Sequence, residues 1–226
     1  QDLGTDNGGV HVRKWNIKSD GYLKSEEVTL DGSKTRAWQA LKDAVRTASD
    51  GDVITISGEV KATNEGSGSY INSGEIVIDK NLTIKKADGA TSAILNANCN
   101  YSGSPPSSFG YPTPQHRIFK VEAGKKLTLQ NLTLKNGKAQ GAADAGLGGA
   151  IFVKGATVNM TGCTFTGNEA NNGGGVYADG TASTPTEVII SGGIIGGTNA
   201  ADANKATGTA ADKGYGGGIF AAERSR

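Results

Sequence analysis

The chain has 226 residues, of which 35 are glycine and only 6% are aromatic. A compact globule of this length would normally contain more large apolar side chains, whereas one elongated domain with a thin core needs fewer. The formal net charge of +1 gives no electrostatic reason to expect nucleic acid or an anionic membrane as a partner. No apolar run is long enough to span a bilayer, so direct membrane insertion of this chain is not expected.

The first 32 residues predict a short pair of strands. Alternating apolar residues precede Asp20-Gly21, a dipeptide typical of turns, and a returning strand is expected over residues 22–30. An exposed strand edge invites aggregation, so this segment is expected to cover an open end of the domain. A separate binding hairpin is the alternative, and no specific residue favours it.

Between about residues 35 and 48 the apolar spacing changes to three and four. This spacing is typical of one face of an amphipathic helix, and it is set by Trp38, Leu41, Val45 and Ala48. Thr35 is the expected N-cap, and Asp50-Gly51 is the expected end. We expect residues 1–50 to form an N-terminal cap, with Trp38 as its buried anchor rather than as a ligand platform.

Residues 51–226 predict coils of short strands. Alternation predicts strands within Asp52–Val60, Glu75–Lys85 and Ala93–Leu95. The order of helix, Asp-Gly-Asp and alternating strands is similar to the opening of pectate-lyase-like right-handed β-helices.

The alternation stops between about residues 96 and 115, a stretch that holds four of the five prolines. A loop this long is uncommon in a compact domain and is often functional. Tyr101, Phe109 and Tyr111 are therefore a candidate ligand-contact set. The alternative is that these rings pin the loop to the side of the domain.

A fourteen-residue phrase then occurs three times, at Lys126–Ala139, Thr157–Ala170 and Glu187–Ala200. In each copy, apolar residues alternate with other residues on both sides of a polar break, which predicts two short strands. Aligned, the copies form four columns, which are Leu127/Val158/Val188, Leu129/Met160/Ile190, Leu132/Cys163/Gly193 and Leu134/Phe165/Ile195.

A glycine-rich phrase links the copies and begins a further strand. Its motif residues are Gly148, Gly149, Ala150, Ile151, Gly174, Gly175, Val176, Gly217, Gly218 and Ile219. About three strands per coil of ~20–25 residues fits a β-helical repeat, in which stacked coils bury each other's apolar residues. An antiparallel β-sandwich is the alternative, but its strands need not repeat one another. The predicted fold is an all-β solenoid, a single right-handed parallel β-helix domain with an N-terminal amphipathic capping helix.

Three asparagines of the repeats, Asn131, Asn136 and Asn168, are expected at corners, where asparagine tolerates left-handed backbone and can stack into a polar ladder. The two cysteines are predicted to stay unbridged. Cys163 belongs to an inward column, whereas Cys99 lies at the mouth of the long loop.

Two motifs resemble a known family. Gly148-Gly149-Ala150-Ile151, together with Phe165-Thr166-Gly167-Asn168, resembles the paired GGA(I/L/V) and FxxN motifs of the chlamydial polymorphic membrane proteins. The asparagine comes later in the other copies, at Asn136 and Asn199. The resemblance implies an autotransporter passenger, at the cell surface or outer membrane or secreted, that binds a host or bacterial surface protein or glycan. A further strand pair is expected after Ile219, so the chain is expected to be a fragment of a longer protein.

Residues for catalysis are sparse. A polysaccharide lyase or hydrolase would need clustered carboxylates, but Asp144, Asp179 and Asp202 fall in separate predicted loops. His116-Arg117 is expected to be a solvated strand edge. We therefore predict no catalytic, cofactor-binding or metal-binding residues and a non-enzymatic adhesin or passenger domain. A carbohydrate-active enzyme and a structural spacer are the alternatives.

Overall fold

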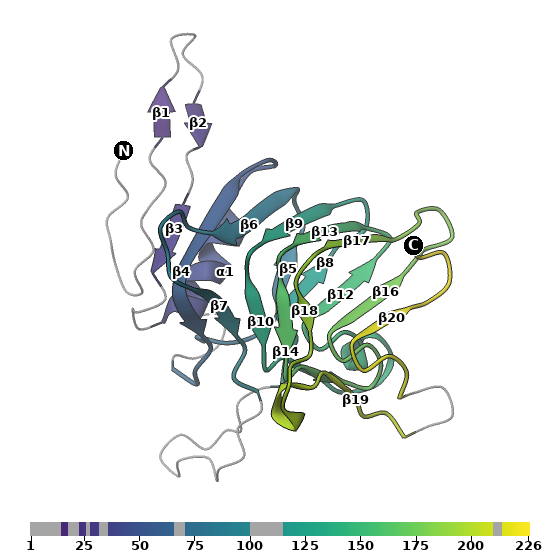
Figure 1. Ribbon diagram of the computed structural model, residues 1–226. Helices are drawn as coiled ribbons and strands as arrows, with labels where there is room; N and C mark the ends of the chain where they lie inside the picture. The colour runs from purple at the N-terminus through teal and green to yellow at the C-terminus, as the bar shows by residue number, and fades with distance from the viewer. Residues whose placement is uncertain are drawn as a thin grey trace.

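The computed structural model describes residues 36–65, 71–99, 115–209 and 214–226, together with the backbone of three short strands nearer the N-terminus. These parts of the protein are mostly β-structure, in which parallel strands form a strongly curled sheet with an α-helix at its N-terminal end (Figure 1). The parallel pairing excludes the antiparallel β-sandwich.

The curled sheet has ten strands in two joined faces. The first face contains β3 (Val28–Asp31), β4 (Val53–Lys61), β6 (Leu82–Lys86), β9 (Lys126–Gln130), β13 (Thr157–Thr161) and β17 (Glu187–Ser191). The second face shares the long β4 and continues with β7 (Ala93–Asn96), β10 (Thr133–Lys135), β14 (Thr164–Thr166) and β18 (Ile194–Ile195).

Two further parallel sheets contribute strands to the turns of the chain. Five strands form the first, which are β5 (Ile76–Ile78), β8 (Phe119–Val121), β12 (Ile151–Lys154), β16 (Val176–Asp179) and β20 (Ile219–Ala221). Three two-residue strands form the second, which are β11 (Lys138–Ala139), β15 (Glu169–Ala170) and β19 (Lys205–Ala206). The turn from β6 to β8 has three strands, as expected, whereas the turns that begin at β9, β13 and β17 have four. Two-residue strands are too short to show alternation, so the sequence pattern does not reveal them.

The register of these sheets confirms the predicted alignment of the repeats. Leu127 pairs with Val158 and Val158 with Val188, and the Leu129–Met160–Ile190 and Leu134–Phe165–Ile195 columns pair in the same way. Side chains in these columns point inward and are almost fully buried in all but the last turn. Each such side chain stabilises the fold by about 1.5–3 kcal/mol.

Helix α1 (Ala37–Thr47) packs on the first turn through β3, β4 and β5. Trp38 and Leu41 are fully buried, which confirms Trp38 as an anchor, and the indole N–H donates to the carbonyl of Gly74 at 2.8 Å. The predicted N-cap was wrong, because the helix is preceded by Arg36 in the left-handed conformation with no capping side chain of its own. A residue distant in sequence caps the helix instead, because Asn72 Oδ1 accepts the N–H of Gln39 in the first turn at 2.8 Å.

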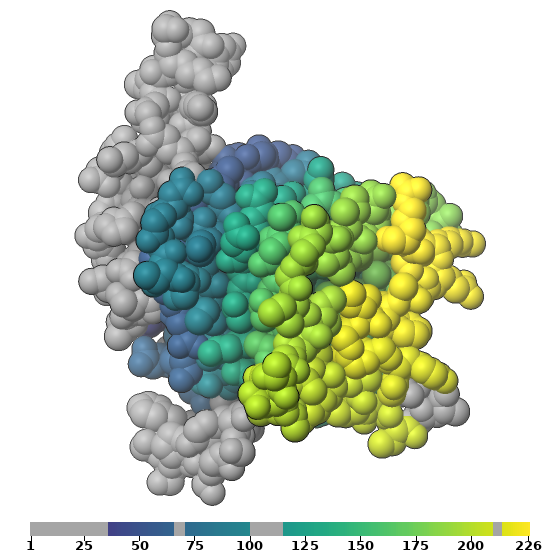
Figure 2. Space-filling model, viewed as in Figure 1, coloured from purple at the N-terminus to yellow at the C-terminus, as the bar shows by residue number. Residues whose placement is uncertain are grey.

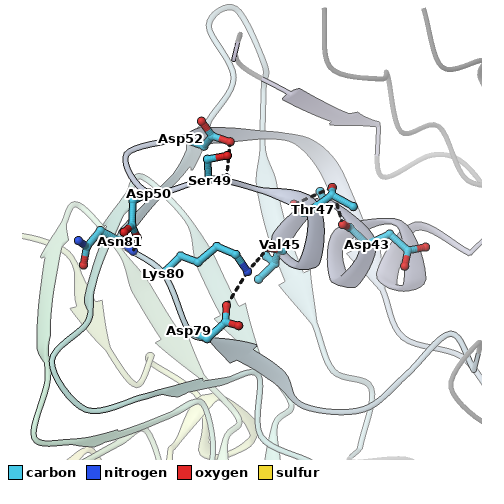
Figure 3. A network of polar contacts seen from close by, with 10 residues as sticks. Asp43, Val45, Thr47, Ser49, Asp50, Asp52, Asp79, Lys80 and Asn81 are labelled. Carbon is cyan, nitrogen blue, oxygen red and sulfur yellow. Dashed lines mark hydrogen bonds and ion pairs between the residues drawn. The ribbon is translucent and has the colours of Figure 1, made fainter. Parts of the chain in front are cut away.

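A polar network ties the end of α1 to the first corner of the sheet (Figure 3). Asp52 accepts the N–H of Ser49 at 2.7 Å, and Asp50 accepts the N–H of Asn81 at 2.7 Å. Lys80 pairs with Asp79 at 2.6 Å and reaches the carbonyl of Val45 at 3.4 Å. The carboxylates of the Asp-Gly-Asp corner therefore hold backbone donors of the helix end and of the next turn.

Near the N-terminus, β1 (Trp15–Ile17) and β2 (Leu23–Ser25) pair antiparallel on either side of the predicted turn. Strand β3 pairs in parallel with β4 and covers that edge of the first turn, in agreement with the capping role expected for this segment.

Candidate binding face

The outward side of the five-stranded sheet carries a column of large side chains. Register places Val77, Lys120, Phe152, Tyr177 and Phe220 in line. The Phe152 and Tyr177 ring centroids lie 5.8 Å apart, and those of Tyr177 and Phe220 lie 5.2 Å apart. Tyr215 stacks on Phe220 at 5.8 Å and is 48% exposed. The sequence signal for this ladder is the aromatic residue that ends each glycine-rich phrase, and sequence analysis did not identify it as a site.

Loops from three successive turns pack beside this column. We call residues 140–149, 171–175, 207–209 and 214–217 the loop ridge. The Asn171 side chain donates to the carbonyl of Gly141 at 2.8 Å, and the carbonyl of Asn171 accepts the N–H of Gly214 at 2.9 Å. Asn172 Oδ1 accepts the N–H of Tyr215 at 3.0 Å. The loops of successive turns therefore form one connected surface.

Arg117 anchors the first loop of the ridge. Its guanidinium donates to the carbonyls of Asp144 and Ala145 at 2.6 and 3.1 Å and lies 5.0 Å from the centroid of the Phe152 ring. Its Nε is 3.2 Å from a carboxylate oxygen of Glu75, an ion pair whose angle is not that of a hydrogen bond. The expectation of a solvated strand edge at this residue was wrong, because the loop at 143–146 covers the arginine.

The neighbouring His116 is buried as well, so the same expectation fails there. Its ring packs on Trp38, with the centroids 5.4 Å apart, and its Nδ1 lies 2.7 Å from the carbonyl oxygen of Arg117. Its Nε2 is buried without a hydrogen-bond partner. Burial is the main cause that lowers the pKa of His116 to about 4, and the nearby charge of Lys42 adds to the effect.

Two cavities flank this anchor and share Glu75 in their walls. One of about 490 Å³ lies between α1 and β5 and includes Lys42 and Arg46. The other, of about 370 Å³, lies between β8 and the loop ridge and includes Lys120 and Gln140. Both have room for a small polar group or for part of a larger ligand.

Charges on this face occur as opposite pairs. Lys120 lies 2.9 Å from Glu122, and Lys154 lies 3.3 Å from Asp144. Within the described residues, no three His, Cys, Asp or Glu side chains lie together in a way that could hold a metal ion. The face thus offers both signs of charge beside aromatic rings.

The predicted glycine motif residues lie where the loop ridge meets the sheet, and their role is packing. Gly148, Gly173 and Gly216 all have φ between 63° and 66°. A Cβ on Gly149 would lie 2.2 Å from the carbonyl oxygen of Gly174, so stacked turns approach too closely for a side chain there. Ala150, Ile151, Val176 and Ile219 continue from these corners towards the core.

Asn168 is the fully buried centre of a polar ladder. Its Oδ1 accepts the N–H of Gly137 at 2.9 Å, and its Nδ2 donates to Leu134 O at 3.0 Å and to Asn204 Oδ1 at 2.8 Å. Asn204 rather than Asn199 is the equivalent residue in the next turn, because a 3₁₀ segment at Ala200–Asp202 is inserted there. Asn168 and Asn204 are each followed by a charged residue and then alanine, whereas Asn199 is followed by two alanines, and this difference is the signal that could have found Asn204.

Asn131 and Asn136 adopt left-handed backbone, with φ of 56° and 58°, as predicted for corners. Cys99 and Cys163 form no disulfide, as predicted, but Cys99 belongs to the buried core rather than to the loop. Burial raises the pKa of its thiol to about 11. Tyr101, Phe109 and Tyr111 lie outside the described residues.

Comparisons with protein-family models, with curated proteins and with solved structures gave no match for this chain. Among the described residues, no helix is both long enough and apolar enough to cross a bilayer.

Proposed function

We propose that the chain is a right-handed parallel β-helix that serves as a non-enzymatic adhesion or passenger domain at a bacterial cell surface or outer membrane, or in secreted form. The repeated order of parallel strands supports the β-helix, and the stacked inward columns supply its thin core. The placement at the cell surface rests on the resemblance of the glycine and FxxN motifs.

The observation that carries the proposal is the loop ridge beside the aromatic column. Loops positioned by a rigid scaffold are where binding residues concentrate. Here Tyr215 is a part-exposed ring at one end of the aromatic column, and the face also carries paired charges such as Lys154 and Asp144. This mixture suits a polar ligand with apolar patches, namely a glycan or a protein surface.

The charged groups favour binding over catalysis. Glycoside hydrolysis needs two carboxyl groups free to face one bond. On this face Glu75, Glu122 and Asp144 each lie within an ion pair, and the guanidinium of Arg117 holds backbone carbonyls. These side chains therefore maintain the surface rather than present an acid and a base.

A binding screen against glycans and matrix proteins tests the proposal. For any ligand that binds, Tyr215→Ala and Lys120→Glu should weaken binding by about tenfold or more. Lys126→Glu is the matched control, since it makes the same charge change on a different sheet and should leave the affinity unchanged. An equal loss of affinity in the Lys126→Glu control would show that the ligand binds to another surface.

The enzymatic alternative is tested with the same preparation. Incubation with acidic and neutral polysaccharides should yield no new reducing ends and no unsaturated products. Turnover that disappears in Glu75→Gln would replace the adhesion proposal with a carbohydrate-active enzyme. If the protein neither bound a ligand nor turned over a polysaccharide, the remaining alternative would be a structural spacer.

A further inference from the structure

An amine, a carboxylate and an amide meet on the outward side of the second face of the curled sheet. They belong to Glu59 on β4, Asn96 on β7 and Lys135 on β10, and register sets Asn96 directly beside Lys135. Lys135 Nζ lies 3.0 Å from Glu59 Oε1, and Asn96 Nδ2 donates to the same oxygen atom at 2.8 Å. The turns that carry these strands lie side by side in Figure 1 and in Figure 2, in colours that run from blue to green.

The Asn96 amide is held and polarised by its surroundings, and the residue is only 5% exposed. Asn96 Oδ1 accepts the N–H of Asn98 at 2.9 Å and an N–H of the Asn136 side chain at 3.0 Å. Two N–H donors on one carbonyl oxygen stabilise the negative charge that forms there when a nucleophile adds to the carbonyl carbon. The Cγ atom of Asn96 is therefore prepared for attack by an amine from the neighbouring strand.

Glu59 can move protons between the amine and the amide. Desolvation raises the pKa of its carboxyl group, but hydrogen bonds from Lys135 and Asn96, together with the charge of Lys135, outweigh it and lower the pKa. The group is therefore ionised at neutral pH, and as a carboxylate it can accept a proton from the lysine ammonium. Because both nitrogen atoms lie within hydrogen-bond reach of the same oxygen, a proton taken from one can be given to the other.

We propose that the chain joins Lys135 to Asn96 by an isopeptide bond, with Glu59 as the proton carrier. Glu59 takes a proton from Lys135 Nζ, and the neutral amine adds to Asn96 Cγ. The Cγ–Nδ2 bond then breaks as a new bond between Cγ and Nζ remains. Lys135 gives up two protons in all, and Glu59 carries both to Nδ2, so the nitrogen leaves as ammonium and the carboxylate is restored. One C–N bond replaces another, so the reaction needs neither an oxidant nor a reductant.

The bond would tie two neighbouring turns of the stack together. Residues 96–135 would form a covalent ring, and a cross-link of this kind stabilises a fold mainly by restricting the unfolded chain. The fold holds the amine beside the amide, which gives the reaction the advantage of an intramolecular step. Each chain reacts only once, so a slow reaction is sufficient. This cross-link does not depend on the adhesion function proposed above.

Peptide mapping by mass spectrometry tests the proposal on the whole chain. After incubation of the folded protein and digestion with trypsin, the peptides that contain Asn96 and Lys135 should appear as one branched species, lighter by one ammonia than the two peptides together. Lys135→Arg keeps the positive charge but removes the amine, so its peptides should stay separate. Glu59→Gln should form the linked species about tenfold more slowly or less. Lys61→Arg is the matched control, because Lys61 lies beside Asn96 on the opposite side, and it should keep the link.

Urea unfolding gives a second measurement. The midpoint should fall in Lys135→Arg, which loses the covalent ring, and should stay close to the native value in Lys61→Arg. An ammonia lost elsewhere in the chain would not join the two peptides, so the branched species identifies this reaction alone. Separate peptides from the native protein after prolonged incubation, or a linked species that forms as fast in Glu59→Gln as in the native protein, would each overturn the proposal.

Discussion

Acidification below pH 6.5 is expected to destabilise the protein through His116. In the folded chain this imidazole lies against Trp38, and its pKa is lowered from 6.5 to about 4. In the unfolded chain the pKa returns to its ordinary value. Between these two pKa values the unfolded chain binds a proton that the folded chain does not. The contribution of the neutral His116 to the free energy of unfolding is therefore fully present above pH 6.5. It falls as the pH drops and levels off below about pH 4.

The size of the effect follows from the difference between the two pKa values. It corresponds to about 3 kcal/mol of unfolding free energy lost between pH 6.5 and pH 4. Since a typical domain is stable by about 5–15 kcal/mol, the loss is a large share of the total. The protonated ring would place a charge in the apolar contact beneath α1, so the helix end of the domain should loosen first.

Urea unfolding at pH 7.5 and pH 4.5 measures this loss. His116→Phe is the comparison variant, because it keeps a ring beside Trp38 and removes the titration. The variant loses the hydrogen bond to the Arg117 carbonyl at both pH values, which shifts its stability by a constant amount. Carboxylates elsewhere titrate alike in both proteins. The pH-dependent loss should be smaller in the variant by about 3 kcal/mol, and an equal loss in both proteins would refute the reasoning.

Three other predictions concern the core. Trp38→Ala should lower the free energy of unfolding by about 3–5 kcal/mol in urea titrations, and an equally stable variant would show that α1 does not close the stack. Phe165→Asp should abolish cooperative thermal unfolding, because it buries an unpaired charge between Leu134 and Ile195, whereas the outward Thr164→Asp should fold. Denatured, non-reduced protein should give two free thiols, since Cys99 and Cys163 are unbridged, and none would contradict the structure.

The sequence alone determined much of the architecture. Residues two apart in a strand face the same way, and parallel turns place equivalent residues in register, so aligning the three phrases predicted the Leu127–Val158–Val188 pairing residue by residue. The period change around Trp38 located the helix for the same reason. These features are periodic, and periodicity is visible without coordinates.

Contacts between non-repeating segments were decided only by the tertiary structure. Arg117 is buried because the loop at 143–146 covers it, and Asn72 caps α1 from 33 positions away along the chain. The loop ridge arises in the same way, where loops of different length from successive turns are brought side by side. Such contacts join residues whose sequence spacing carries no period, so burial and partner choice depend on three-dimensional packing that a linear pattern does not encode.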